Sequence, residues 1–384
     1  TEIYTLSLHD ALPIWVVKRL RNHPSLALWS GDNEIDSCFL TGNIPPKLLP
    51  SDNKITREVL KQAVKNFDPW RDYLESSPYV SDAVVRRWQS GEVDAAFDAC
   101  PELHLYPVAS TIRADLRRTN AHFISETGPI FINAMAETPE FVARELPRAR
   151  RLWEADAATV AQEGWRHQAE GYFCIWRDGV KQCLREFFGD SVTPSPDNPE
   201  TIIQAVNLFC ADTFKCVIEY YRARKWRKTG VLWWSLIDMW PMMFNYSVVD
   251  YAFRKKKPFD WIRQSQQPVC LIGGEDEAGG IALTAVNDTL EAVAGTYRLA
   301  RWRGDRGLTY YHEDGFRIEP NGVARLDVAA PEFREYGLHW IEWAYGATRG
   351  ENHFVRGSAP FRFEDYADWD AFLTERYAGT RAKA

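Results

Sequence analysis

Close to its start the chain reads Leu26-Ala27-Leu28-Trp29-Ser30-Gly31-Asp32-Asn33-Glu34, four apolar residues that run into a polar turn and an acid. An unbroken apolar run of this kind is typical of a strand that is buried on both faces of a parallel sheet. A later stretch repeats the arrangement, because a strand predicted over His122–Ser125 ends at Glu126. Each of these predicted strands therefore delivers one glutamate at its carboxyl end.

Predicted strands and helices alternate up to about residue 266. Further strands are predicted near Tyr73–Ser76, over Leu103–Tyr106 and over Gly230–Leu236. Apolar residues at helical spacing predict a helix over Ile55–Phe67, and a second helix over Pro199–Trp226 begins with a capping asparagine and a proline. This order predicts a parallel α/β fold. Polar residues follow the strand ends, which is the active-site face of a (β/α)8 barrel.

The sequence pattern changes after Gln267-Pro268. Short apolar runs separated by Gly, Pro, Asn and Asp then predict a small antiparallel β-sandwich of the immunoglobulin type. These runs are Val269–Ile272, Ile281–Asn287, Gly295–Ala300, Gly322–Val328 and Gly337–Tyr345. We therefore expect one domain over residues 15–266 and a second over residues 267–384. Residues 1–14 read TEIYTLSLHDALPI, which resembles a translated sequencing adapter, and we expect this segment to be non-native.

Composition excludes several classes of protein. The 384 residues carry 46 Lys and Arg against 53 Asp and Glu, so a net charge of −7 gives no reason to expect binding to nucleic acid. No stretch approaches the roughly 20 unbroken apolar residues of a membrane span. Seven cysteines without a CxxC pair predict neither a zinc site nor a disulfide framework. The 16 Trp, 16 Tyr and 20 Phe predict a large core, an aromatic-lined cleft, or both. Cytoplasmic, periplasmic and secreted locations all fit the sequence.

Glu34 and Glu126 are the candidate chemical groups. Cleavage of a glycosidic bond needs one carboxyl group to protonate the leaving oxygen and another to attack or stabilise the anomeric carbon. Two strand ends of a barrel can hold such groups across a pocket. By position alone, however, a glutamate at a strand end is more often an ordinary solvated side chain.

The residues around the two glutamates form motifs. Arg21-Asn22-His23-Pro24-Ser25 precedes Trp29-Ser30-Gly31-Asp32-Asn33-Glu34, and the second motif is Ser125-Glu126-Thr127-Gly128. They resemble the acid/base and nucleophile signatures of glycoside hydrolase family 2, most closely its β-mannosidase branch. Asp32 departs from the commoner asparagine, and Thr127 stands where an aromatic residue is usual.

The resemblance covers nearly everything from residue 15 onward. Later motifs resemble the last barrel strand, the closing helix region and the C-terminal sandwich of the family: residues 230–241, 247–251, 265–269, 287–289 and 352–354. The resemblance implies strands four to eight of a TIM barrel, with strands one to three upstream of residue 15.

The resemblance also implies roles for individual residues. Glu34 is the general acid and then the base, with a raised pKa, and Glu126 is the ionised nucleophile, with the carboxyl groups about 5–5.5 Å apart. The implied sugar-binding residues are Asn33 at the 2-hydroxyl, Tyr106 as a donor to Glu126, Trp234 as a stacking platform, and His104 and Trp240 along the cleft. No metal and no cofactor is implied. Without the resemblance, Asn33 is equally a turn residue, Tyr106 a core aromatic and His104 a structural histidine.

The implied activity is that of a retaining exo-glycosidase that removes terminal non-reducing β-D-mannose, with little or no activity expected from this chain alone. β-Galactosidase, β-glucuronidase and exo-β-glucosaminidase activities are alternatives on the same scaffold. A non-catalytic carbohydrate-binding scaffold is an alternative of a different class. The basic run Arg254-Lys255-Lys256-Lys257 is expected to be a solvated turn.

Overall fold

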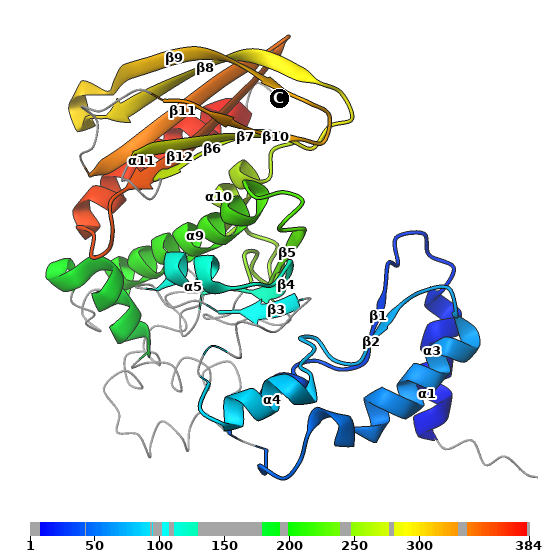
Figure 1. Cartoon of the computed structure of the whole chain (residues 1–384). Coiled ribbons are helices and arrows are strands. Elements are labelled where there is room, and N and C mark those ends of the chain that lie inside the picture. The colour runs from blue at the N-terminus through cyan, green and yellow to red at the C-terminus, as the bar shows by residue number, and fades with distance from the viewer. Residues whose placement is uncertain are drawn as a thin grey trace, which may run out of the picture. The chain divides into compact units, whose positions relative to one another are not determined.

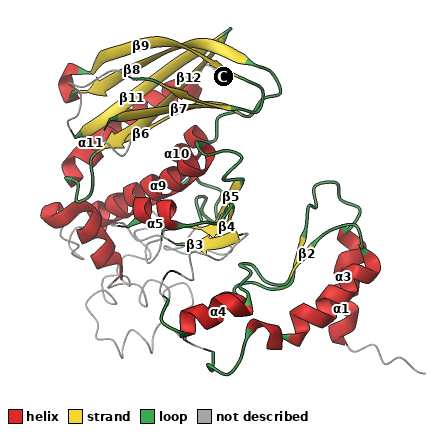
Figure 2. Ribbon diagram, viewed as in Figure 1, coloured by secondary structure: helices red, strands yellow, loops and turns green. Residues whose placement is uncertain are grey.

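A computed structural model of the chain describes residues 8–42, 44–92, 94, 102–106, 111–129, 179–192, 199–238, 247–275, 280–328 and 336–381. Helices and strands are mixed, and the strands form several separate sheets (Figures 1 and 2). The chain divides into two compact units. Unit 1 comprises Thr1–Leu105 with Arg117–Glu126, and unit 2 comprises Tyr106–Leu116 with Thr127–Ala384.

Unit 1 consists of short elements joined by long connections. In chain order they are α1 (Leu8–Leu20), β1 (Trp29–Ser30), α2 (Ile35–Cys38), the 3-10 turn η1 (Pro50–Asp52), the π-helix η2 (Ile55–Leu60), α3 (Lys61–Phe67), β2 (Tyr73–Leu74), α4 (Asp82–Gln89), β3 (Glu102–Leu105) and β4 (Phe123–Thr127), whose last residue belongs to unit 2. Helix α1 begins at Leu8, inside the segment 1–14 that is expected to be non-native, and continues to Leu20. The helix predicted over 55–67 is present, but its first part is a π-helix.

The first predicted strand is shorter than its apolar run. β1 pairs in parallel with β2 at two positions only, Trp29 with Tyr73 and Ser30 with Leu74. Leu26 is used instead in a turn, where its N–H donates to the His23 carbonyl. The prediction of a strand over Leu26–Trp29 is therefore wrong in extent, because the turn that follows Pro24 takes up the first of its residues.

Unit 2 contains the long helix α9 and most of the strands. Its elements are α5 (Ile112–Arg118, whose last two residues belong to unit 1), a helical segment over 179–188, η4 (Gly189–Ser191), α9 (Pro199–Arg222), β5 (Gly230–Trp233), α10 (Pro258–Ser265), β6 (Val269–Glu275), β7 (Ile281–Asn287), β8 (Val293–Trp302), η5 (Gly304–Arg306), β9 (Leu308–Ile318), β10 (Val323–Leu326), β11 (Gly337–Tyr345), β12 (Thr348–Arg356) and α11 (Phe363–Arg381).

Two antiparallel sheets in unit 2 share a core. One has the order β10-β7-β6 and the other β12-β11-β8-β9. Side chains alternate along β11, so that Ile341 joins the core between the sheets, whereas Leu338 and Trp340 join the core formed with α9 and α11. The four-stranded sheet is thus covered on one face by the other sheet and on the opposite face by helices (Figure 1).

All five strands predicted after residue 267 coincide with observed strands, but β9, β12 and α11 were not predicted. β9 forms the edge of its sheet, and most of its side chains are exposed or half-buried. A strand with one free edge needs few apolar residues, so its sequence carries a weak signal.

Helix α9 is a core helix. Among the described residues it is the one helix long and apolar enough to cross a membrane by length and composition, but 78% of its apolar window is buried inside the protein. That burial explains its apolar composition without a membrane.

The basic run at 254–257 is not fully solvated. Lys256 and Asp238 are each only 3% exposed, and their charged groups lie 3.2 Å apart. Ser247 donates to Asp238 and accepts a hydrogen bond from Lys256 at 3.0 Å. Burial lowers the pKa of Lys256, against the opposing effect of the Asp238 charge. The prediction of a solvated turn is therefore wrong for Lys256, because its ammonium group pairs with a carboxylate that lies 18 residues upstream.

This buried pair gives the first test. Lys256→Ala leaves Asp238 as an uncompensated buried charge, so we expect a loss of about 3–5 kcal/mol in the free energy of unfolding. The control, Lys47→Ala, removes an exposed ammonium group and should change stability by less than about 0.5 kcal/mol. Chemical denaturation measures both. Equal effects of the two substitutions would contradict a stabilising role for the pair.

Candidate active site

The turn after β1 is fastened to the segment after β2 through backbone hydrogen bonds. Ser77 donates its N–H to the Asp32 carbonyl at 3.0 Å, and its own carbonyl accepts the Glu34 N–H at 2.8 Å. Glu34 adopts a left-handed backbone conformation with φ 64°. Gly31 cannot be replaced without movement, since a Cβ there would collide with the Tyr73 hydroxyl and the Glu75 carbonyl. Gly31 of the motif is therefore needed because β2 and the residue after it pass too close to leave space for a side chain.

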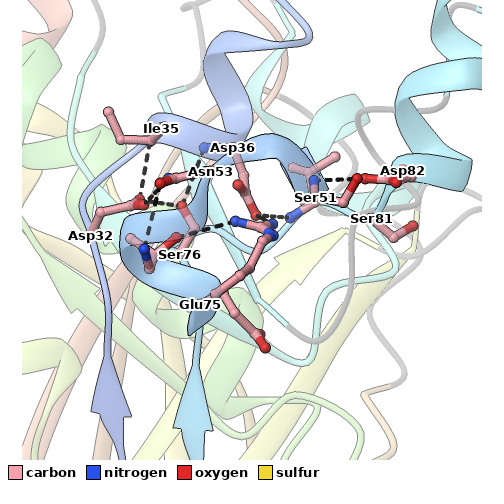
Figure 3. Close-up of polar contacts among 12 residues, drawn as sticks. Asp32, Ile35, Asp36, Ser51, Asn53, Glu75, Ser76, Ser81 and Asp82 are labelled. Atoms are coloured by element: carbon pink, nitrogen blue, oxygen red, sulfur yellow. Dashed lines mark hydrogen bonds and ion pairs between the residues drawn. The ribbon is translucent and has the colours of Figure 1, made fainter. Parts of the chain in front are cut away.

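Asp32 accepts hydrogen bonds from three sides (Figure 3). Its Oδ1 accepts from the Ile35 N–H at 3.3 Å and from the Ser76 hydroxyl, and its Oδ2 accepts from the Asn53 amide at 3.3 Å. The amide of Asn53 is oriented, because its Oδ1 accepts the Thr56 N–H. An aspartate suits this place because both of its oxygens are acceptors.

Glu34, His104 and Glu126 come together within unit 1. His104 lies on β3 and Glu126 on β4, which are neighbours in one sheet. His104 Nδ1 is 2.8 Å from Glu34 Oε1 and 3.8 Å from Glu126 Oε2. One carboxylate oxygen of each glutamate and a ring nitrogen of His104 all lie within 4.8 Å of one another. These three residues are far apart in the sequence, and the fold brings their functional atoms within 4.8 Å of one another.

The three side chains differ in exposure. That of His104 is 5% exposed, that of Glu126 17% and that of Glu34 43%. The imidazole therefore forms the floor of the site, while the carboxyl group of Glu34 reaches solvent.

The hydrogen bond to His104 changes the pKa of Glu34. When the hydrogen is on His104 Nδ1, its donation to the Glu34 carboxylate lowers that pKa, and this effect exceeds the opposing one of burial, which raises it. The sequence analysis expects a raised pKa for a general acid. That expectation is wrong for the arrangement in which the hydrogen is on Nδ1, because a donated hydrogen bond stabilises the carboxylate.

Two carboxylates and an imidazole are also a possible set of metal ligands. Here both ring nitrogens are already in use, Nδ1 with Glu34 and Nε2 with the Ser77 hydroxyl at 3.2 Å. A metal ion would have to displace the contact between His104 and Glu34.

The remaining predicted residues lie as follows. Asn33 is exposed and forms a bridge to Ser77. Trp234 follows β5 and is 46% exposed, and its backbone N–H donates to the Thr127 carbonyl at 2.8 Å. The ring of Trp233 packs edge-on against that of Phe214. Tyr106 directly follows β3 and is half-buried. Trp240 lies outside the described residues. The sugar-binding roles of these side chains, and the hydrogen bond expected between Tyr106 and Glu126, stay predictions.

Sequence reasoning missed Ser77 and Glu102. The Ser77 hydroxyl lies 3.2 Å from His104 Nε2 and donates to Glu102 Oε2 at 3.1 Å. A signal was present for Ser77, because it follows the strand predicted over Tyr73–Ser76 and so lies at a carboxyl end. Glu102 begins its strand and carried no such signal.

Comparisons with known proteins place the chain in a class. Over 323 residues it is 24% identical to β-mannosidase A of Emericella nidulans, a match that covers 75% of this chain and 32% of the relative. It is 24% identical to the β-mannosidase of Mus musculus over 316 residues, which cover 76% of this chain and 33% of the relative. No protein-family model matches the chain. The chain thus spans about a third of the length of these curated relatives.

Solved structures show the same fold. The β-D-mannosidase of Dictyoglomus thermophilum matches with a TM-score of 0.66 and 21% identity, covering 92% of this chain and 40% of that one. An exo-chitosanase of Amycolatopsis orientalis matches with a TM-score of 0.56 and 13% identity, covering 90% and 38%. These similarities indicate the class of the glycoside hydrolases. Within that class, the chain resembles the C-terminal region of a β-mannosidase of glycoside hydrolase family 2.

The turn at Asp32 gives the second test. Asp32→Asn installs the residue usual in the family but turns one acceptor into a donor that faces the Asn53 amide. We expect a loss of about 1–2 kcal/mol in the free energy of unfolding. Asp72→Asn, at an exposed position of the same unit, should stay within about 0.5 kcal/mol. Denaturation curves that are unchanged for Asp32→Asn would contradict the structural role assigned to its second oxygen.

Proposed function

We propose that this region carries the catalytic residues of a retaining exo-β-mannosidase, which removes terminal non-reducing β-D-mannose by double displacement. The observation that carries the proposal is the convergence of Glu34 and Glu126, whose oxygens both lie within 4.8 Å of each other and of His104. Both glutamates lie in motifs that resemble those of family 2. The identity of the sugar rests on the relatives, which are named β-mannosidases.

The separation of the carboxyl groups favours retention of configuration. Retaining glycosidases hold the two groups about 5–5.5 Å apart, whereas inverting enzymes separate them by about 6.5–9.5 Å to admit a water molecule. The observed spacing, within 4.8 Å between nearest oxygens, supports the first class.

The proposed roles follow from exposure and position. Glu126 attacks the anomeric carbon and forms a covalent glycosyl intermediate, while Glu34 protonates the glycosidic oxygen as the aglycone leaves. Glu34 then removes a proton from the water molecule that releases the sugar. Its greater exposure suits a group that must meet both the aglycone and water. Asn33, Tyr106, Trp234, Trp240 and His104 are proposed as the sugar-binding residues.

We also propose a domain assignment. Residues 15–266 form strands four to eight of a TIM barrel, and residues 267–384 form the β-sandwich. Support comes from the change to purely antiparallel pairing after α10, which ends at Ser265, four residues before β6 begins at Val269.

The nucleophile is tested by Glu126→Ala. Because the chain covers about a third of its relatives' length, the assay uses a version extended with the upstream part of the Dictyoglomus thermophilum enzyme. We expect turnover of an aryl β-mannoside to fall on the order of 10⁴-fold or more. Added azide should restore part of the rate and give an α-mannosyl azide, because it attacks from the face that Glu126 vacates.

The control is Glu58→Ala, which removes an exposed carboxyl group from the same unit and should keep the parent rate. Normal turnover by Glu126→Ala would show that the nucleophile is a different residue. If the extended parent hydrolysed no β-glycoside, the non-catalytic scaffold would be the better interpretation.

The acid is tested by Glu34→Ala in the same extended protein. A phenyl mannoside needs protonation of its leaving oxygen, so its kcat/KM should fall by about 10²–10⁴-fold. A dinitrophenyl mannoside leaves without a proton, so its rate of bond cleavage should change little. Equal losses for the two substrates would exclude Glu34 as the general acid.

A further inference from the structure

A line of hydrogen bonds leads from Glu34 into the interior of unit 1. Glu34 Oε1 contacts His104 Nδ1 at 2.8 Å, His104 Nε2 contacts the Ser77 hydroxyl at 3.2 Å, and this hydroxyl donates to Glu102 Oε2 at 3.1 Å. Glu102 is 7% exposed, and its other oxygen is buried without a hydrogen-bond partner. The line therefore ends at a buried carboxyl group.

The direction of each hydrogen bond follows from the number of hydrogens available. A carboxylate only accepts, so the single hydroxyl hydrogen of Ser77 is used by Glu102. The Ser77 oxygen must then accept from His104, which places a hydrogen on Nε2. In a neutral imidazole the other nitrogen, Nδ1, is then bare and accepts.

This direction decides the state of Glu34. A bare Nδ1 at 2.8 Å from Glu34 Oε1 forms a favourable contact only when Glu34 carries the hydrogen. We propose, on the basis of the proposed function, that Ser77 and Glu102 are positioning residues that hold His104 as the Nε2–H tautomer and thereby keep Glu34 protonated before reaction. The site is then ready as an acid.

The same tautomer helps the second step. Once Glu34 has protonated the aglycone, its carboxylate faces the lone pair of Nδ1, which opposes the negative charge. The carboxylate is therefore a stronger base toward the water molecule that releases the sugar. Among the described residues, Glu126 also faces the ring, at 3.8 Å from Nδ1, and Glu102 acts on the ring through Ser77.

The backbone of Ser77 allows a clean substitution. Its N–H and carbonyl hold the turn at Asp32 and Glu34, and Ser77→Ala leaves both in place. Only the hydroxyl between His104 and Glu102 is lost. Ser77→Thr keeps a hydroxyl and serves as the conservative variant, and Ser90→Ala removes an exposed hydroxyl elsewhere in unit 1.

The tautomer is measured by nitrogen NMR on the 384-residue chain, with its eight histidines labelled with nitrogen-15. The two neutral tautomers give different nitrogen–proton correlation patterns, and the signals absent from His104→Gln identify the ring. We expect the Nε2–H pattern in the parent, in Ser77→Thr and in Ser90→Ala. In Ser77→Ala and Glu102→Gln we expect this preference to be lost in favour of hydrogen on Nδ1.

A kinetic measurement follows in the extended protein. Ser77→Ala should lower kcat/KM for a phenyl mannoside by about tenfold, a part of what general acid catalysis contributes. The dinitrophenyl mannoside should be unaffected, since it needs no acid, and Ser77→Thr should recover the phenyl rate. A merely structural role would lower both substrates alike.

Two results would overturn the inference. The first is an Nδ1–H or doubly protonated ring in the parent, and the second is an Nε2–H pattern that persists in Ser77→Ala. Neither depends on turnover, so they stay distinct from a failure of the proposed function, which would appear as full activity in Glu126→Ala or as equal losses for the two substrates in Glu34→Ala.

Discussion

The backbone pairing between Ser77 and the turn at Asp32–Glu34 is the contact on which the site depends. Two hydrogen bonds, at 3.0 and 2.8 Å, fix the turn against the segment after β2. The turn forces Glu34 into a left-handed conformation, which a glutamate adopts only when its surroundings impose it. Asp32 and Gly31 serve the same contact, one as an acceptor of three donors and the other by leaving room for β2.

The imidazole of His104 then joins two carboxyl groups, one from the turn after β1 and one from β4. Neutral imidazole has one donor and one acceptor nitrogen, so it can favour either the protonated or the ionised form of Glu34. The hydrogen bonds from His104 to Ser77 and from Ser77 to Glu102 determine which of these two forms is favoured. A retaining glycosidase needs the same glutamate as acid and then as base, and one contact at 2.8 Å can serve both steps.

Unit 2 has a comparable dependence on buried polar contacts. Asp238 follows β5, Lys256 lies shortly before α10, and the Ser247 hydroxyl forms a hydrogen bond with each of them. Removing one member leaves the other charged and without water, which is why such pairs are costly to break. Val248, whose carbonyl accepts the Lys256 N–H, packs against Phe214 and Ile218 of α9 and so supplies apolar burial beside the pair. The paired charges add geometric specificity rather than hydrophobic stability.

The sequence alone determined the alternation of strands and helices, the five antiparallel strands after residue 267 and the two glutamates at strand ends, because apolar periodicity and local motifs are written along the chain. It could not give the extent of β1, the exposed edge strand β9 or the burial of Lys256, since each depends on a partner distant in sequence. For the same reason only the tertiary structure placed Ser77 and Glu102 behind His104. The direction of a hydrogen bond depends on every group in the line, and those groups become neighbours only when the chain folds.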